Sequence, residues 1–440
     1  MKKLAVVFML LLYVALVGFI QPTNILTIDD LVLESNFNEL PKLYIEGDIN
    51  KLSKKKEERD FSVKYESSNL NFDGFAKIKL QGSSSLNYDK KNYTIKLYKD
   101  EKFSNKYPID FGWGEQYKYC LKANWVDKTH ARNIVTANIV ADIQKKYHVL
   151  DNTPNNGEID GFPIEVYAND EFLGLYTLNI PKDDWMFNMD SSDENHIVFA
   201  GDSWSAATDF RKEANFDDWE LEVGEETDET LEKFNRLIKF INESSDEEFK
   251  EDIHEYLNLD SVLNYYIMVD FALLVDNTGK NMLLSTYDGK IWYVTLYDLD
   301  TSWGTNWDGS GLEDYNYVVG SDKSGSNLFK RIKKNFNNEL ADRYFELRED
   351  ILTEENIINE FKIFTSSIPL NVYEMESNRW DDIPGYDLKQ IYDYLDKRIL
   401  FLDRYYSDLY NRSPVSIDVD DIEFDLNMLE EFLKSNGLCN

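Results

Sequence analysis

Residues 75–97 read FAKIKLQGSSSLNYDKKNYTIKL, two alternating runs on either side of a turn of small residues. Apolar and polar side chains alternate with period two in 75–80 and again in 93–97, which is the pattern of half-buried β-strands. The glycine and serines between the runs favour a turn. This stretch therefore predicts two strands joined by a loop and, with its neighbours, a strand-rich amino-terminal half.

The strand pattern continues on both sides of this stretch and then gives way to helical spacing. Further strands are expected at 43–45, 117–124, 163–167 and 173–178, with a helix that begins after Asp127 or Thr129. Helices are expected at 230–242, 246–257, 261–275 and across 327–410, interrupted by a hairpin whose strands, 281–286 and 290–296, meet at Asp288-Gly289. The sequence predicts an α+β fold of two lobes, with a ligand site in the cleft between them.

Composition excludes several classes of function. The formal net charge is −35 over 440 residues, which argues against nucleic acid or an anionic membrane face as a partner, because both demand a basic surface. The two cysteines and four scattered histidines give neither a disulfide framework nor a zinc site. Acidic blocks at 217–220 and 225–229 are interpreted as solvated faces or loops.

The amino terminus has the features of a targeting segment. Lys2 and Lys3 precede an apolar run over 4–20, as in a secretory signal peptide or a retained membrane anchor. We expect a signal peptide or anchor at 1–22, a linker at 23–38, lobes at 39–182 and 183–412, and an acidic tail at 413–440. The protein is expected to be secreted or membrane-anchored, outside the cytoplasm.

The loop of small residues and the lysines after it are candidates for binding phosphate. Backbone N–H groups at Gly82 and hydroxyls of Ser83, Ser84 and Ser85 can approach phosphate oxygens closely. Lys91 precedes the next strand and Lys96 lies within it, and protein kinases place a phosphate-pairing lysine on a strand beneath a small-residue loop. An ordinary hairpin loop with solvent-facing lysines is the alternative.

A second candidate group lies about 180 residues further along. Asp276 and Asn281 are five positions apart, the separation of the catalytic Asp and the metal-binding Asn in a kinase catalytic loop. Asp298 follows the predicted hairpin, with Asp300 two residues on. Carboxylate and amide oxygens suit Mg²⁺, and Asp276 can accept or orient the proton of an attacking hydroxyl. The alternatives are a turn with a strand-end cap, or a structural Ca²⁺ site.

Together these segments resemble the spore-coat protein H (CotH) kinase family. Residues 82–96 resemble its most recognisable motif, and 297–304, which read YDLDTSWG, resemble its aromatic, Asp-x-Asp and closing aromatic-Gly pattern. Softer similarities lie at 122–133, 173–176, 378–380 and 397–398. The resemblance extends from about residue 40 to about residue 410.

The resemblance implies an atypical two-lobed protein-kinase fold and Ser/Thr kinase activity with ATP and Mg²⁺ or Mn²⁺. It implies that Lys96, with Lys91 as its rival, pairs with the phosphates. Asp276 corresponds to the catalytic Asp, Asn281 to the catalytic-loop Asn and Asp298 to the metal-binding Asp, with Asp300 as the alternative. The predicted helix over 131–147 contains no Glu, so the lysine–glutamate pair of ordinary kinases is not evident.

The resemblance also implies a protein acceptor, a surface or spore-coat protein with Ser or Thr. Two rival functions remain open at this point. One is a scaffold for surface or coat assembly that keeps the fold without catalysis. The other is phosphoryl transfer to a glycan or small molecule, which Trp303 and Trp307 near the site would suit by stacking on a sugar.

Overall fold

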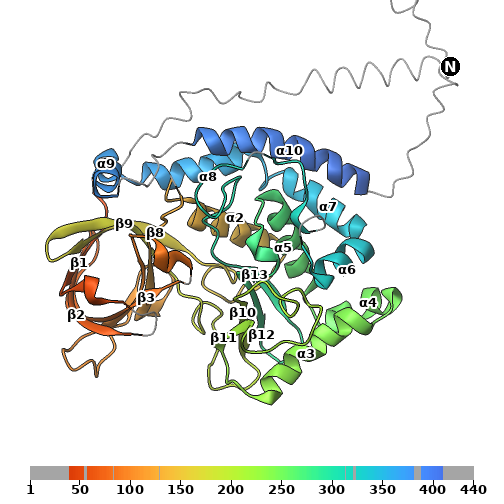
Figure 1. Ribbon diagram of the computed structural model, residues 1–440, viewed down its shortest axis with the longest axis horizontal. Coiled ribbons are helices and arrows are strands. Elements are labelled where there is room, and N and C mark those ends of the chain that lie inside the picture. The colour runs from red at the N-terminus through yellow and green to blue at the C-terminus, as the bar shows by residue number, and fades with distance from the viewer. Residues whose placement is uncertain are drawn as a thin grey trace, which may run out of the picture.

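The computed structural model describes residues 39–53, 57–82, 84–127, 129–312, 314–320, 324–380 and 388–409. Their amino-terminal part forms a closed barrel of seven strands in the order β1-β2-β3-β4-β7-β9-β8 (Figure 1). The strands are β1 (Lys42–Glu46), β2 (Arg59–Glu66), β3 (Asn71–Gln81), β4 (Asn92–Tyr98), β7 (Lys118–Lys122), β8 (Gly161–Ala168) and β9 (Glu171–Asn179). A small ribbon, β5 (Ile109–Asp110) and β6 (Glu115–Gln116), and a short 3-10 helix, η2 (Ile49–Lys51), complete this part.

The stretch from 75 to 97 forms the antiparallel pair β3–β4, as predicted, with Ile78 opposite Ile95. These two side chains point into the barrel core with those of the neighbouring strands. The alternate residues, such as Lys79 and Thr94, lie on the outer face. Parallel pairing of β1 with β8 closes the barrel, which removes the unpaired sheet edges of an open layer.

A second sheet of four strands follows in the order β11-β10-β12-β13. Its strands are β10 (Ile197–Gly201), β11 (Trp219–Val223), β12 (Met282–Thr286) and β13 (Tyr293–Leu296). The predicted hairpin is confirmed as β12–β13, but it is not an isolated two-stranded insert. The unpredicted strands β10 and β11 extend it, and an acidic block assigned to solvent contributes Trp219, which is fully buried.

Helices cover the second sheet and continue to the end of the described chain (Figure 1). They are α2 (Arg132–Lys146), α3 (Asp228–Glu243), α4 (Asp246–Asp252), α5 (Leu259–Phe271), α6 (Asn327–Asn335), α7 (Asn337–Arg348), α8 (Glu354–Ser366), α9 (Leu370–Arg379) and α10 (Lys389–Leu409), with short 3-10 helices η3 (Ser84–Asn87), η4 (Ile253–Glu255) and η5 (Asp276–Thr278). The protein therefore contains both strands and helices and is α+β, as predicted. The Asp127 carboxylate accepts the N–H of Arg132 at 2.7 Å, at the predicted start of α2.

A buried ion pair fastens the barrel to α9. Lys90 Nζ lies 2.5 Å from Glu376 Oε1 and also donates to the carbonyls of Ala123 and Leu175. The other Glu376 oxygen accepts the N–H of Leu175, in β9, at 2.7 Å. Both charged side chains are almost fully buried, so every polar atom of the pair depends on partners within the protein.

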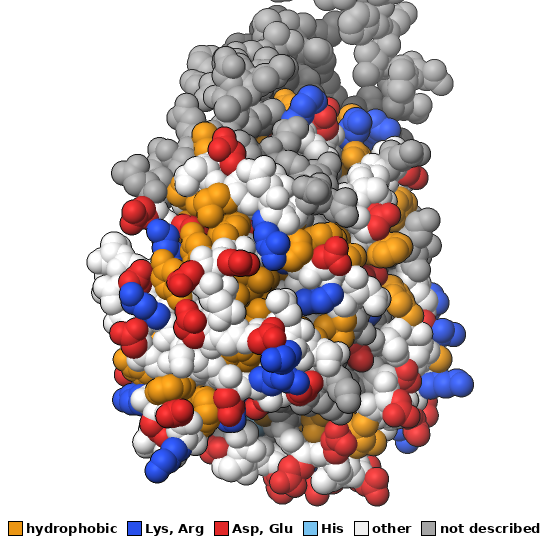
Figure 2. Space-filling view, turned by 60° about the vertical axis from the view of Figure 1, so that its left-hand side comes forward, with side chains coloured by type: hydrophobic (Ala, Val, Ile, Leu, Met, Phe, Trp, Pro, Cys, Tyr) orange, Lys and Arg blue, Asp and Glu red, His pale blue; other side chains and the backbone are white. Residues whose placement is uncertain are grey.

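Charges of both signs are interspersed over the face shown in Figure 2, which brings the barrel side forward. The large negative charge of the chain is therefore not gathered into a single acidic patch on this face. Within the described ranges, no helix is long and apolar enough to cross a membrane. The expected signal peptide or anchor, the linker and the acidic tail lie outside the described residues.

Candidate active site

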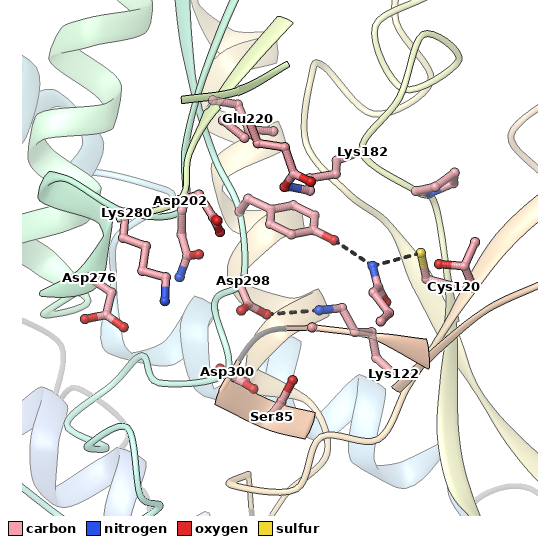
Figure 3. A pocket seen from close by; sticks show the side chains of 18 of the residues that line it. Ser85, Cys120, Lys122, Lys182, Asp202, Glu220, Asp276, Lys280, Asp298 and Asp300 are labelled. Atoms are coloured by element: carbon pink, nitrogen blue, oxygen red, sulfur yellow. Dashed lines mark hydrogen bonds and ion pairs between the residues drawn. The ribbon is translucent and has the colours of Figure 1, made fainter. Parts of the chain in front are cut away.

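A cavity of about 320 Å³ lies between the outer face of the barrel and the second sheet (Figure 3). The barrel side is formed by β3, β4 and β7, and the opposite side by β10, β11, β12 and the segments that flank β12 and β13. Five lysines and six carboxylates line it: Lys79, Lys118, Lys122, Lys182, Lys280, Asp202, Glu220, Glu222, Asp276, Asp298 and Asp300.

Asp298 and Asp300 follow β13 and reach the cavity side by side. Lys122 Nζ, at the end of β7, lies 3.0 Å from Asp298 Oδ1. Burial opposes ionisation of Asp298, but Lys122, together with Lys182 and Lys280, holds the pKa of this carboxyl below its ordinary value. Burial and the neighbouring Asp298 raise the pKa of Asp300 to about 7. Ionised Asp298 therefore opposes the ionisation of Asp300.

Asp276 and Asn281 come to the same cavity from the turn after α5. Asp276 lies in η5, and burial raises the pKa of its carboxyl, an effect that the nearby Lys280 opposes and Asp298 reinforces. Asn281 is held at the start of β12 by its N–H, which donates to the Gly201 carbonyl at 3.0 Å. The structure thus brings Asp276, Asn281, Asp298 and Asp300 together; their separate roles stay predictions.

The chemistry of this group fits Mg²⁺ or Mn²⁺. Asp298, Asp300 and Asn281 can offer oxygen ligands, and a carboxylate that opposes the ionisation of its neighbouring carboxyl is a suitable environment for a cation. The described residues contain no group of three or more His, Cys, Asp or Glu side chains arranged for a metal ion.

The lysine that pairs with Asp298 is Lys122, and the two predicted lysines have other partners. Lys96 Nζ pairs with Glu58 at 2.6 Å, while Lys91 Nζ donates to the carbonyls of Leu86 and Tyr88. The outer face of β4 does form the cavity wall, but through Thr94. Lys96 lies opposite Lys118 in the β4–β7 register. Lys118 is four residues before Lys122, which lies at the end of β7 that reaches Asp298.

The loop of small residues reaches the cavity through Ser85, which lies beside Asp300 in Figure 3. Ser84 begins η3, and Ser83 lies outside the described residues. Gly82 has a φ of +108°, and a Cβ there would lie only 2.0 Å from the Ser85 hydroxyl oxygen. Only glycine allows this turn, which folds the serine back toward the carboxylates.

Comparison with protein-family models matches residues 78–402 to the family described as CotH kinase protein. The matched region runs from β3 to α10 and includes every element of the cavity. The chain belongs to the CotH kinase family. No curated protein matched the chain. Family membership suggests kinase-like function, and the cavity between barrel and second sheet is the part of this CotH kinase chain with the residues for it.

A second ion pair in this cavity was missed from the sequence. Lys182 Nζ lies 2.5 Å from Glu222 and 3.3 Å from Glu220, both on β11. Lys182 and Lys122 each lie 5.3 Å from the centre of the Tyr297 ring, so this ring contacts two of the cations of the cavity. Glu220 belongs to a block that was assigned to solvent. Glu220 contacts Lys182 only because β11 lies beside the cavity. No local pattern in the sequence predicts that position of the strand.

Helix α2 supports the segment that carries Asp298 and Asp300 with polar side chains. Asn133 Oδ1 accepts the N–H of Leu299 at 2.9 Å, and Arg132 Nε donates to the Ser302 carbonyl at 3.2 Å. Thr136 accepts from the Trp303 indole at 2.7 Å. Trp303 is fully buried and therefore unavailable for stacking on a sugar, whereas Trp307 is 70% exposed and lines the cavity.

Proposed function

We propose that this CotH kinase transfers the γ-phosphoryl group of ATP to a Ser or Thr hydroxyl of a protein, with the barrel and the helical part acting as two lobes. The observation that carries the proposal is the contact of Lys122 with Asp298 in a cavity that also holds Asp276 and Asn281. These groups are the cation, the metal ligands and the base that phosphoryl transfer requires.

Asp298 and Asn281 would hold the divalent metal, with Asp300 beside them. When bound, Mg²⁺ or Mn²⁺ neutralises charge that develops on the phosphate oxygens. When the metal occupies Asp298, Lys122 would donate to those phosphate oxygens instead. The Lys122 ammonium is buried, so it needs another anionic partner in place of Asp298. Ser85 and the backbone at Gly82 would lie along the phosphates, as small residues allow close approach.

Asp276 would accept or orient the hydroxyl proton of the acceptor. Its carboxyl is partly buried, with a pKa raised by burial, which makes it a better base than a solvated aspartate. Lys280 lies next to it in Figure 3 and opposes that shift. An ammonium at this point would also stabilise charge on the transferring group.

The proposal is tested by transfer of radiolabel from [γ-³²P]ATP, with Mg²⁺ and with Mn²⁺. The acceptor is either the protein itself or a mixture of basic or acidic proteins. We expect transfer by the wild type and its loss in Asp298→Ala. Thermal unfolding with ATP and metal separates this function from a scaffold, because a ligand that binds the native state must stabilise it. A wild type with neither transfer nor stabilisation is a scaffold.

A sugar hydroxyl is the second candidate acceptor. Trp307 is the observation that favours it, since an exposed indole at the cavity wall offers a flat face for a sugar ring. Transfer to oligosaccharides, lost in Trp307→Ala while autophosphorylation is kept, would support this acceptor over a protein.

We further propose that the chain acts outside the cytoplasm, in the secreted, membrane-tethered or spore-coat setting that its first 22 residues and its family suggest. Fractionation of cells that express the full chain, with and without residues 1–22, tests this location. Loss of export on deletion supports it, and an unchanged cytoplasmic pool in both contradicts it.

A further inference from the structure

Asn277 joins the two segments that carry the proposed metal ligands. It lies in η5 directly after Asp276 and is 1% exposed. Its Nδ2 donates two hydrogen bonds, one to the Asn281 carbonyl at 3.2 Å and one to the Tyr297 carbonyl at 2.9 Å. One side-chain amide therefore bridges the residue that offers its own amide to the metal and the residue just before Asp298.

The two carbonyls lie at the point where β12 and β13 part. The strands pair up to Met282 opposite Leu296, so Asn281 and Tyr297 would form the next antiparallel pair. There, the carbonyls accept from the Asn277 amide. Directly at this junction Asn281 and Asp298 both have a φ of +57°, a left-handed conformation that side chains adopt at a cost and that surrounding contacts must hold.

The orientation of the Asn277 amide follows from these contacts. Two carbonyls can accept only from its NH₂ group, so its oxygen faces the other way, where it has no hydrogen-bond partner among the described residues. The backbone carbonyl of Asn277 accepts from the Tyr265 hydroxyl of α5. The bridge is thus anchored on the buried helix α5.

We infer that Asn277 is a positioning residue that sets the spacing and direction of Asn281 and Asp298 for a divalent cation. The inference rests on the proposed function, which gives that cation its role in phosphoryl transfer. Groups that hold metal ligands by hydrogen bonds affect metal affinity or activity by about 10- to 100-fold when changed. Asn277 acts through the backbone of both ligand segments at once.

The test is Asn277→Asp, which keeps the side-chain size but replaces the donating NH₂ by an oxygen that faces two carbonyls. Binding of Mn²⁺, with a non-hydrolysable ATP analogue present, is measured by electron paramagnetic resonance, and the Mg²⁺ dependence of phosphoryl transfer is measured beside it. We expect the Mn²⁺ dissociation constant and the half-saturating Mg²⁺ concentration to rise on the order of tenfold.

Asn264→Asp is the matched control. Asn264 is also fully buried, in α5, and its Nδ2 donates to Gln144 rather than to a ligand segment. We expect this variant to lose stability without a change in Mn²⁺ affinity. If Asn277→Asp lowers transfer while its Mn²⁺ affinity equals that of the wild type, the residue is structural only and the inference is wrong.

Tyr265→Phe covers the case in which Asn277→Asp does not fold. It removes only the hydroxyl that holds the Asn277 carbonyl, and a severalfold weaker Mn²⁺ affinity is expected, with unchanged affinity contradicting the inference. A wild type that binds Mn²⁺ but transfers no phosphoryl refutes the proposed function and leaves this comparison valid. A wild type that binds no Mn²⁺ overturns the inference.

Discussion

At the scale of single residues, the proposed phosphoryl transfer depends on which lysine reaches the carboxylates. Lys96 and Lys122 occupy neighbouring strands of the barrel and have the same sequence signature, a lysine in an alternating run. Alternation puts Thr94 and Lys96 on the same face of β4, and Thr94 shows that this face lies at the cavity. Position along the strand depends on where the second sheet meets the barrel, which no local pattern encodes.

Lys122→Ala and Lys96→Ala form a matched pair of predictions. We expect Lys122→Ala to lower the rate of phosphoryl transfer on the order of 10²-fold or more, as loss of a preorganised cation does. Lys96 pairs with Glu58 near the surface, so Lys96→Ala should leave the rate unchanged and stability within about 1 kcal/mol. Initial rates with radiolabelled ATP are the measurement. Loss of activity in Lys96→Ala alone would refute the assignment.

At the scale of elements, the prediction succeeded where a run has one buried face or a strong turn signal. Alternation predicted the β3–β4 pair, because the apolar side of each strand lies in a core, and the Asp288-Gly289 turn predicted the β12–β13 hairpin although β12 is buried throughout. It failed for β10 and β11. The five consecutive buried residues of β10 give no alternation and no Asp-Gly turn adjoins them, and β11 carries charged residues that line the cavity.

The pair between Lys90 and Glu376 is expected to hold α9 on the barrel. Glu376→Ala would leave a buried ammonium without its counter-charge, at a cost of about 3–5 kcal/mol in the free energy of unfolding. Glu374, two residues earlier on the exposed side of α9, provides the control, and Glu374→Ala should stay within about 0.5 kcal/mol. Urea unfolding measures both. Equal effects of the two substitutions would show that the pair contributes nothing specific.

Asp270, near the end of α5, should make stability depend on pH. Burial raises the pKa of its carboxyl from 3.8 to about 6, although the Gly320 N–H and Arg398 oppose this. A raised folded pKa means that the contribution of the group is most favourable below pH 3.8 and is lost as pH rises through about 6. The stability of Asp270→Asn relative to wild type should therefore increase by about 3 kcal/mol across that window.

The measurement for Asp270 is the difference in unfolding free energy between the two proteins at a series of pH values, so that the many other carboxylates cancel. A difference that does not change with pH would mean that Asp270 titrates normally in the folded protein.

At the scale of the whole molecule, a strand-rich half followed by a helical half was predicted, but the strand β2 and the closure of the barrel were not. Closure joins β1 to β8, more than 110 residues apart, and pairing at that distance leaves no mark on either segment. The candidate site also depends on contacts between segments that are distant in the sequence. Its carboxylates were recognised from spacing within one short region, whereas Lys122, Lys182 and Glu222 come from elements that only the complete fold brings to one cavity.

The net charge of −35 predicts a salt-dependent stability. Like charges repel more strongly in the compact state than in the extended chain, and salt shortens the range of that repulsion from about 30 Å at 0.01 M to about 8 Å at 0.15 M. We expect the midpoint of urea unfolding to rise when NaCl is increased over this range. A falling midpoint would show that attractive ion pairs, rather than net repulsion, dominate.

The alternation of β7 has one more consequence. Tyr119 and Leu121 belong to the barrel core, while Lys118, Cys120 and Lys122 between and around them face the cavity. Adding or deleting one residue in this strand would exchange the two sets and put lysines into the core. Substitutions can therefore alter the cavity side without touching the barrel interior, whereas length changes in β7 cannot be tolerated, so descendants of this chain can diversify here only by replacing side chains.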